Sequence, residues 1–154
     1  MIDIAHIHPM LVHFPIVLFI SAVALEFLVM IRGGDLAGRD CLPKMALSVL
    51  LLGTISAIAA ASFGDMALDK AVALGFPKAP LETHETLGLA TMWIFIALSL
   101  VQLWAWWRRL SLAGGRGWTL TALGLVGVGV LLVTAYHGGE LVYGLGVNVA
   151  PVKP

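Results

Sequence analysis

The chain has 154 residues, of which 60% are hydrophobic and 12% charged, and its formal net charge is zero. Soluble domains carry about a quarter charged residues, so the composition excludes an ordinary soluble domain. The balanced charge argues against a nucleic-acid partner. The single cysteine, Cys41, excludes an internal disulfide, a thiolate metal cluster and a CxxCH attachment site.

Four apolar runs follow one another along the chain, at about residues 9–31, 45–63, 87–107 and 118–136. Each is long enough for a helix that crosses a membrane, which needs about 20 mainly apolar residues. Barrel strands are shorter and alternate in polarity, which these runs do not. We therefore expect an all-α fold, a four-helix up-down bundle that forms one integral membrane domain over residues 1–154. Between the second and third runs, residues 66–76 predict a short interfacial helix.

Basic residues are unequally divided between the two sides of this bundle. The loops after the first and third runs contain Arg32, Arg39, Lys44, Arg108, Arg109 and Arg116. The opposite side contains Lys70, Lys78 and Lys153. Because short cytoplasmic loops are enriched in lysine and arginine, we expect both termini outside. A multi-pass protein of a bacterial inner membrane, with periplasmic termini, fits this pattern.

All five histidines fall on the side of the termini. They are His6, His8 and His13 at the first run, His84 at the third and His137 at the end of the fourth. Ionisable side chains at this depth are costly and usually pair or serve a function, and imidazole is a common ligand of metals and haem iron. The candidate cofactor-binding residues are therefore His8, His13, His84 and His137.

The positions of these histidines favour some ligand pairs over others. His8 and His13 diverge by roughly 140° around a helix axis, so they are not expected to bind one ion together. His13 lies beside Pro15, which should kink the helix and can turn His13 inward. His84, near a helix N-terminus, should stay neutral, which suits ligation. His137, near a helix C-terminus, also fits a stabilising imidazolium.

Small and polar residues inside the runs carry two further expectations. Gly53, Ala57 and Ala61 recur at a spacing of four, which favours close helix packing and would also leave room for a flat cofactor. Glu26 lies inside the first run, where a carboxylate should reach the interface or pair with Arg108 or Arg109.

Three motifs resemble a widespread bacterial family of four-span membrane proteins catalogued as a domain of unknown function. They read HPxxVHFPI at the start, HExxG before the third run and HGGxLVYxxGV at the end. The matching positions are His8, His13, Gly88, His84, His137, Gly138, Gly139, Tyr143 and Gly146. Some relatives carry Rieske iron–sulfur or c-type cytochrome domains, and this context implies respiratory electron transfer with such a redox partner.

The interpretation we favour is an electron-transfer protein that binds b-type haem near the outer face. Non-covalent haem needs axial histidines from two helices at matched depth, and an apolar sleeve. His13 with His84 is the preferred pair of iron ligands. His137 could replace either ligand, bind a propionate, or join His8 at a second haem. On its own the chain would be an electron carrier or an oxidoreductase subunit rather than an enzyme.

Two alternatives stay open at this point. Three imidazoles at one depth also fit a non-haem zinc or copper site without redox chemistry. The protein could also be a purely structural membrane subunit with histidines at the interface. Besides the lipid bilayer and the redox partner, a homo-oligomer is left open.

The unequal division of basic residues gives a testable topology. Reporter fusions after Gly34 and Gly115 should report the cytoplasm, and a fusion after Lys78 should report the periplasm. The reverse pattern would move every histidine to the cytoplasmic face.

Overall fold

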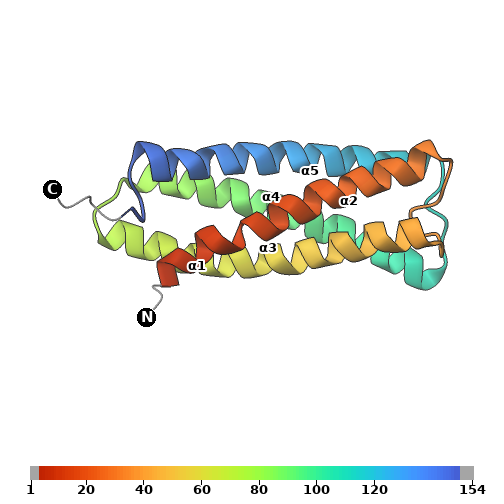
Figure 1. The fold of residues 1–154 in the computed structure, drawn as a ribbon, viewed down its shortest axis with the longest axis horizontal. Helices are drawn as coiled ribbons and strands as arrows, with labels where there is room; N and C mark the ends of the chain where they lie inside the picture. The colour runs from red at the N-terminus through yellow and green to blue at the C-terminus, as the bar shows by residue number, and fades with distance from the viewer. Residues whose placement is uncertain (1–3, 150–154) are drawn as a thin grey trace.

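The computed structural model describes residues 4–149, and these form a bundle of antiparallel helices (Figure 1). The chain order is α1 (Ile4–Leu11), α2 (His13–Ile31), α3 (Cys41–Ala73), α4 (Lys78–Arg108) and α5 (Gly115–Gly139), followed by a π-helical turn, η1 (Glu140–Gly144). The predicted all-α four-helix bundle is therefore confirmed.

Four helical stretches in the described part are long and apolar enough to cross a membrane. They are His6–Ile31, Cys41–Ala73, Lys78–Arg108 and Gly115–Gly144. In Figure 1, α1 begins and α5 ends at the same end of the bundle, which we call the histidine end. The opposite end, where α2 leads into α3 and α4 into α5, we call the Asp35 end.

The expected interfacial helix at 66–76 is wrong, because residues up to Ala73 continue α3. The helix stops only where Gly75 adopts a φ of +89°, a conformation that favours glycine, shortly before Pro77. This long helix carries α3 well past the second apolar run, and its last turns pack at the histidine end. There Ala71 of α3 is buried with Leu81 of α4 and Leu141 of η1.

The first span is interrupted once, at Val12, between α1 and α2. A proline has no backbone N–H, so Pro15 cannot bond to the carbonyl of Leu11. The chain nevertheless stays continuous across the break, because the N–H of Val12 donates to His8 O at 3.1 Å and that of Ile16 donates to Val12 O at 3.3 Å. The interruption therefore lies within one turn of the proline, as the sequence indicates.

Two phenyl rings stack at the centre of the bundle. Phe19 of α2 and Phe95 of α4 are both fully buried, with ring centroids 3.7 Å apart and planes inclined by 7°. Glycines on the other two helices make room for them. A methyl group placed on Gly53 would lie 2.8 Å from the Phe19 ring, and one on Gly127 would lie 3.0 Å from the Phe95 ring.

The bundle consists of two similar hairpins: the first comprises α1, α2 and α3, and the second α4, α5 and η1. Three of the side-chain pairs that meet across their interface are each separated by 76 residues. These pairs are His8 with His84, Phe19 with Phe95, and Glu26 with Gln102. The glycines that face the phenyl rings, Gly53 and Gly127, are 74 residues apart. The two halves of the chain are thus related by an approximate two-fold arrangement.

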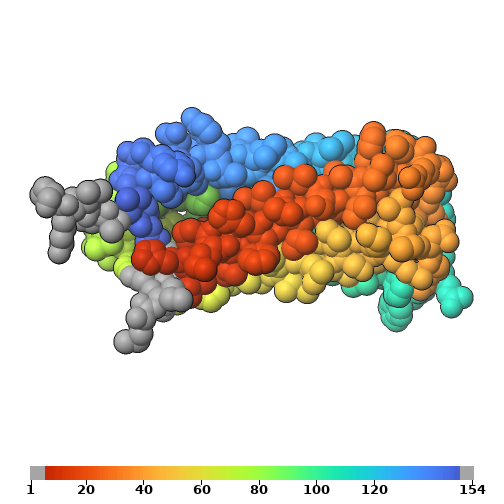
Figure 2. All heavy atoms as spheres, in the orientation of Figure 1, coloured from red at the N-terminus to blue at the C-terminus, as the bar shows by residue number. Residues whose placement is uncertain are grey.

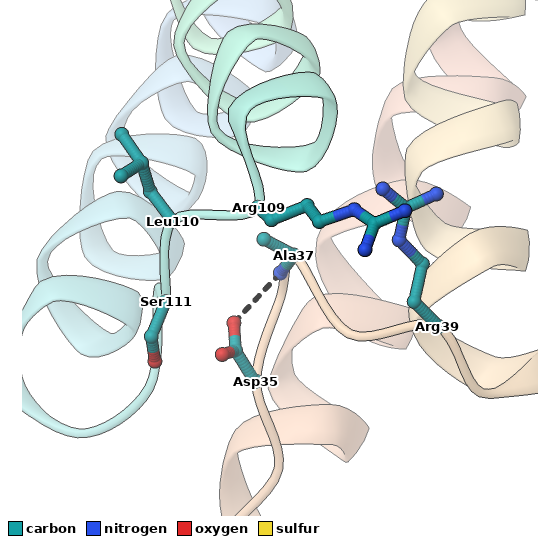
Figure 3. A pocket seen from close by; sticks show the side chains of 6 residues that line it. All are labelled: Asp35, Ala37, Arg39, Arg109, Leu110 and Ser111. Atoms are coloured by element: carbon teal, nitrogen blue, oxygen red, sulfur yellow. Dashed lines mark hydrogen bonds between the residues drawn. The ribbon is translucent and has the colours of Figure 1, made fainter.

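At the Asp35 end, one carboxylate forms hydrogen bonds with both loops. Asp35 Oδ1 accepts the backbone N–H of Ala37 and that of Leu112, each at 2.8 Å. Figure 3 shows Asp35 beside Ser111 in an open pocket that Arg39 and Arg109 also line. Burial favours the neutral acid, but the hydrogen bonds from Ser111, Leu112 and Ala37 outweigh it and hold the Asp35 pKa below its ordinary value of 3.8.

The phenyl stack predicts that Gly53→Ala destabilises the protein. The added methyl group would overlap the Phe19 ring, and overpacking of this kind costs about 1–3 kcal/mol. The melting temperature in detergent should fall. Gly129→Ala is the matched control, because its methyl group meets nothing within 4 Å. Equal melting temperatures for the two variants would contradict this account of the core.

The lowered pKa of Asp35 predicts a pH-dependent contribution to stability. A carboxyl with a depressed folded-state pKa stabilises the fold fully above its unfolded pKa, and loses that contribution as the pH falls through the folded value. The melting temperature of the wild type should therefore exceed that of Asp35→Asn above pH 3.8, and the difference should vanish in stronger acid. Asp40→Asn, at an exposed carboxyl of the same loop, is the control.

Candidate functional site

Two histidines from opposite hairpins face each other at the histidine end. The ring centroids of His8 in α1 and His84 in α4 lie 6.1 Å apart, and the ring planes are inclined by 79°. Both side chains are half-buried. They form the outermost of the three residue pairs, 76 residues apart, along the interface between the hairpins.

Each ring is oriented by the backbone of the neighbouring helix in its own hairpin. His8 Nδ1 lies 2.8 Å from Ala60 O on α3, and His84 Nδ1 lies 3.0 Å from Thr134 O on α5. A neutral imidazole that donates Nδ1–H to a carbonyl presents an unprotonated Nε2. Within residues 4–149 neither Nε2 has a hydrogen-bond partner. The Nδ1 contacts therefore fix one tautomer for both rings, in which Nε2 is the nitrogen free to bind a metal.

Glycine provides the space for each ring. A methyl group on Gly64 would lie 3.0 Å from His8 Cε1, and one on Gly138 would lie 2.9 Å from His84 Cε1. Each glycine follows the bonded carbonyl, that of Ala60 or of Thr134, by four residues. It therefore lies one helical turn further along the same face. Each hairpin thus positions its histidine in the same way. A backbone carbonyl binds the ring, and a glycine one turn further along the helix leaves space for it.

The other histidines of the described chain lie outside this pair. The side chains of His6 and His13 are exposed. The structure therefore does not bring His13 to His84. His137 is half-buried in α5, its ring contacts Tyr136 with centroids 5.6 Å apart, and it is close enough to interact electrostatically with His84. His137 also lines an open groove of about 510 Å³ with Pro80, Glu140 and Leu145.

The surface is hollowed between the first and last helices. In Figure 2, a gap separates α1 from the end of α5, and atoms of α4 form its floor. Figure 1 shows why: α1 and α2 run obliquely across the bundle and diverge from α5 toward the histidine end. The bundle is consequently more open at this end than around the phenyl stack.

His8 and His84 are two potential metal ligands that lie near each other. No group of three or more histidine, cysteine, aspartate or glutamate side chains within residues 6–149 could hold a metal ion. Structural and catalytic zinc sites use three or four protein ligands. The histidine pair can therefore supply two ligands to a metal, and the others must come from elsewhere.

Sequence reasoning preferred His13 to His8 because of the neighbouring Pro15. The buried residues of α2 nevertheless follow the helical stripe Pro15, Phe19, Ala22 and Glu26. His8 precedes Pro15 by seven residues and continues this stripe, whereas His13 does not. The predicted divergence of the two side chains is seen, but His8 is the one that faces inward. The sequence thus contains one signal for His8 in this stripe, and the 76-residue spacing between His8 and His84 is a second.

The expectation for Glu26 is wrong. Its side chain neither reaches the interface nor pairs with Arg108 or Arg109, which are exposed. Instead it is 1% exposed, and Glu26 Oε1 accepts a hydrogen bond from Gln102 Nε2 at 2.7 Å. Gln102 occupies the position equivalent to Glu26 in the second hairpin, which is why the two side chains meet.

Comparison with known proteins agrees with the membrane topology. No curated protein and no solved structure matches the chain. One family model does, and it covers residues 5–151, which is nearly the whole chain. The protein therefore belongs to the family of predicted membrane proteins described as DUF2231, a domain of unknown function.

Proposed function

We propose that this protein is a membrane electron-transfer protein that binds b-type haem, with His8 and His84 as the axial ligands. The observation that carries the proposal is the facing pair of imidazoles, each oriented through Nδ1 by a backbone carbonyl. This assigns His8 the role for which the sequence favoured His13, because the His13 side chain is exposed.

The spacing of the two rings suits a shared metal. Imidazole nitrogens bind metals at about 2 Å, so two imidazoles on opposite sides of one metal have ring centroids about 6 Å apart. The separation in the structure is 6.1 Å. Two ligands already held near the required distance would lower the cost of binding.

The number of ligands favours haem over a bare metal ion. Within the part of the chain that the structure describes, no third histidine, cysteine or carboxylate completes a metal site at His8 and His84. Zinc would need at least one more protein ligand. Haem iron needs only axial ligands from the protein, because the macrocycle supplies the other four.

The cofactor would be bound without a covalent link, because the only cysteine, Cys41, lies at the start of α3. A bound haem would supply one-electron oxidation and reduction of its iron. The residues of this chain contribute the two imidazoles, the carbonyls of Ala60 and Thr134 that orient them, and the apolar helices around them. His137, half-buried near His84, is the residue we propose to bind a propionate.

The proposed setting is a bacterial inner membrane with the histidine end outside. The excess of arginine and lysine near the Asp35 end supports this orientation. A haem near the outer face would exchange electrons with an external redox domain, for which a Rieske or c-type cytochrome domain is the proposed class.

The test is the absorbance spectrum of detergent-purified protein after expression with ample haem supply. The parent should show the Soret and reduced α bands of a low-spin haem. His8→Ala and His84→Ala should each abolish or convert this spectrum, because each removes an iron ligand. His13→Ala and His6→Ala are matched controls, since both remove an exposed histidine from the same end.

Two results would separate the remaining possibilities. If His13→Ala loses the cofactor and His8→Ala keeps it, the axial pair is His13 with His84 and the present assignment fails. If no form of the protein carries haem, the electron-transfer proposal falls, and metal analysis for zinc and copper tests the remaining metal-binding function.

A further inference from the structure

Buried polar atoms without partners gather in one place, far from the histidine pair. Across residues 6–149, four buried side-chain atoms lack a hydrogen-bond partner. They are Glu26 Oε2, Gln102 Oε1, Trp106 Nε1 and Thr121 Oγ1. Buried polar groups are normally paired, so each such atom points to a missing partner.

Three lines of evidence bring these residues together. Gln102 Nε2 donates to Glu26 Oε1 at 2.7 Å, and Trp106 follows Gln102 by one helical turn. On α5, a methyl group placed on Gly124 would lie 3.5 Å from Glu26 Oε2. Thr121 precedes Gly124 by three residues and is buried on the same face.

The antiparallel register of α2 and α5 places Thr121 level with Glu26. Gly117 contacts Met30 at one end of this stretch, and Gly124 contacts Val23 at the other. Glu26 lies four residues before Met30, and Thr121 lies four residues after Gly117. The four unpartnered atoms therefore belong to one layer of the bundle, nearer the Asp35 end than the phenyl stack.

Within the described residues, no cation forms an ion pair with Glu26. The basic side chains at this end are exposed: Arg32, Arg39, Lys44, Arg108, Arg109 and Arg116. Arg39 contacts Trp106 itself: its guanidinium lies 4.0 Å from the centroid of the Trp106 ring and donates to Trp106 O. The hydrogen-bond partner of Glu26 in the structure is the neutral amide of Gln102.

We propose that Glu26, Gln102, Thr121 and Trp106 enclose a buried, hydrated proton-binding site in which Glu26 is held as a neutral carboxylic acid. An isolated carboxylate in an apolar interior is so costly that the group takes up a proton instead. The proton on Glu26 Oε2 has an acceptor at hand in Gln102 Oε1. Acid and amide then form a closed pair, in which Gln102 donates to Oε1 and Glu26 donates from Oε2.

Water completes the site. After this pairing, the indole N–H of Trp106 still needs an acceptor, and the Thr121 hydroxyl needs a partner. A buried water molecule can accept from one group and donate to the other, and such waters typically make about three hydrogen bonds. A metal cation suits the site less well, because the indole N–H would point its positive hydrogen at the ion.

The site is independent of the proposed haem. Glu26 follows His8 by 18 residues, which is about 27 Å along a helix. A failure of haem binding therefore leaves this proposal standing, and a failure of this proposal leaves the haem assignment standing.

The test is infrared spectroscopy of the purified protein in detergent at neutral pH. A protonated carboxyl has a carbonyl stretch that is well separated from the carboxylate bands and shifts in heavy water. We expect this band in the wild type and its loss in Glu26→Gln, which keeps an amide opposite Gln102. Glu82→Gln is the control, because this exposed side chain pairs with Lys78 at 3.1 Å, and its band pattern should match the wild type.

Two further variants test the surroundings. Trp106→Phe and Thr121→Val remove the two groups assigned to water, so the Glu26 band should persist in both with a shifted frequency. The proposal is overturned if the wild type lacks the protonated-carboxyl band, because Glu26 is then ionised, or if Glu26→Gln keeps the band, because it then belongs to another group. It is equally overturned if sodium ions abolish the band at constant pH, because the site then binds a metal cation.

Discussion

The stacking of Phe19 on Phe95 sets the distance between the two hairpins along the whole bundle. Their ring centroids are only 3.7 Å apart, and Gly53 and Gly127 allow both rings to lie flat between the helices. Interiors at this packing density resist deformation, so the spacing is transmitted along the helices. The pairs above and below, His8 with His84 and Glu26 with Gln102, meet because the hairpins are held at this separation.

Lipid imposes a second constraint on these pairs. Polar side chains inside a membrane protein have no bulk water to bind and must find partners within the bundle. The structure meets this need with backbone carbonyls at the histidine end and with a carboxyl–amide contact at the other. Thr54 and Ser99, whose hydroxyls are 2.7 Å apart, do the same between the hairpins. Contacts between polar groups therefore fix the register of the helices, which contacts between apolar surfaces alone would not fix.

The fold could be predicted from the sequence because apolar runs of span length have few alternatives to transmembrane helices. Helix ends were less accessible, since the apolar signal stops near Phe63 whereas α3 continues to Ala73. The candidate site was partly predictable: His84 was named, but His8 was ranked below His13. Local features such as Pro15 do not reveal which face of a helix is buried. Which face is buried depends on the opposite hairpin. In the sequence, the 76-residue spacing between His8 and His84 carried information about that contact.

The carboxyl–amide contact has a consequence for the architecture of the chain. In a symmetric homodimer of identical two-helix hairpins, any residue on the dyad meets its own copy, so a carboxyl can only face a carboxyl. Joining both hairpins in one polypeptide removes that restriction, and Glu26 can lie opposite Gln102. Covalent linkage thus allows an asymmetric pair on a nearly symmetric axis, with an amide opposite a carboxyl where self-association would have placed two carboxyls.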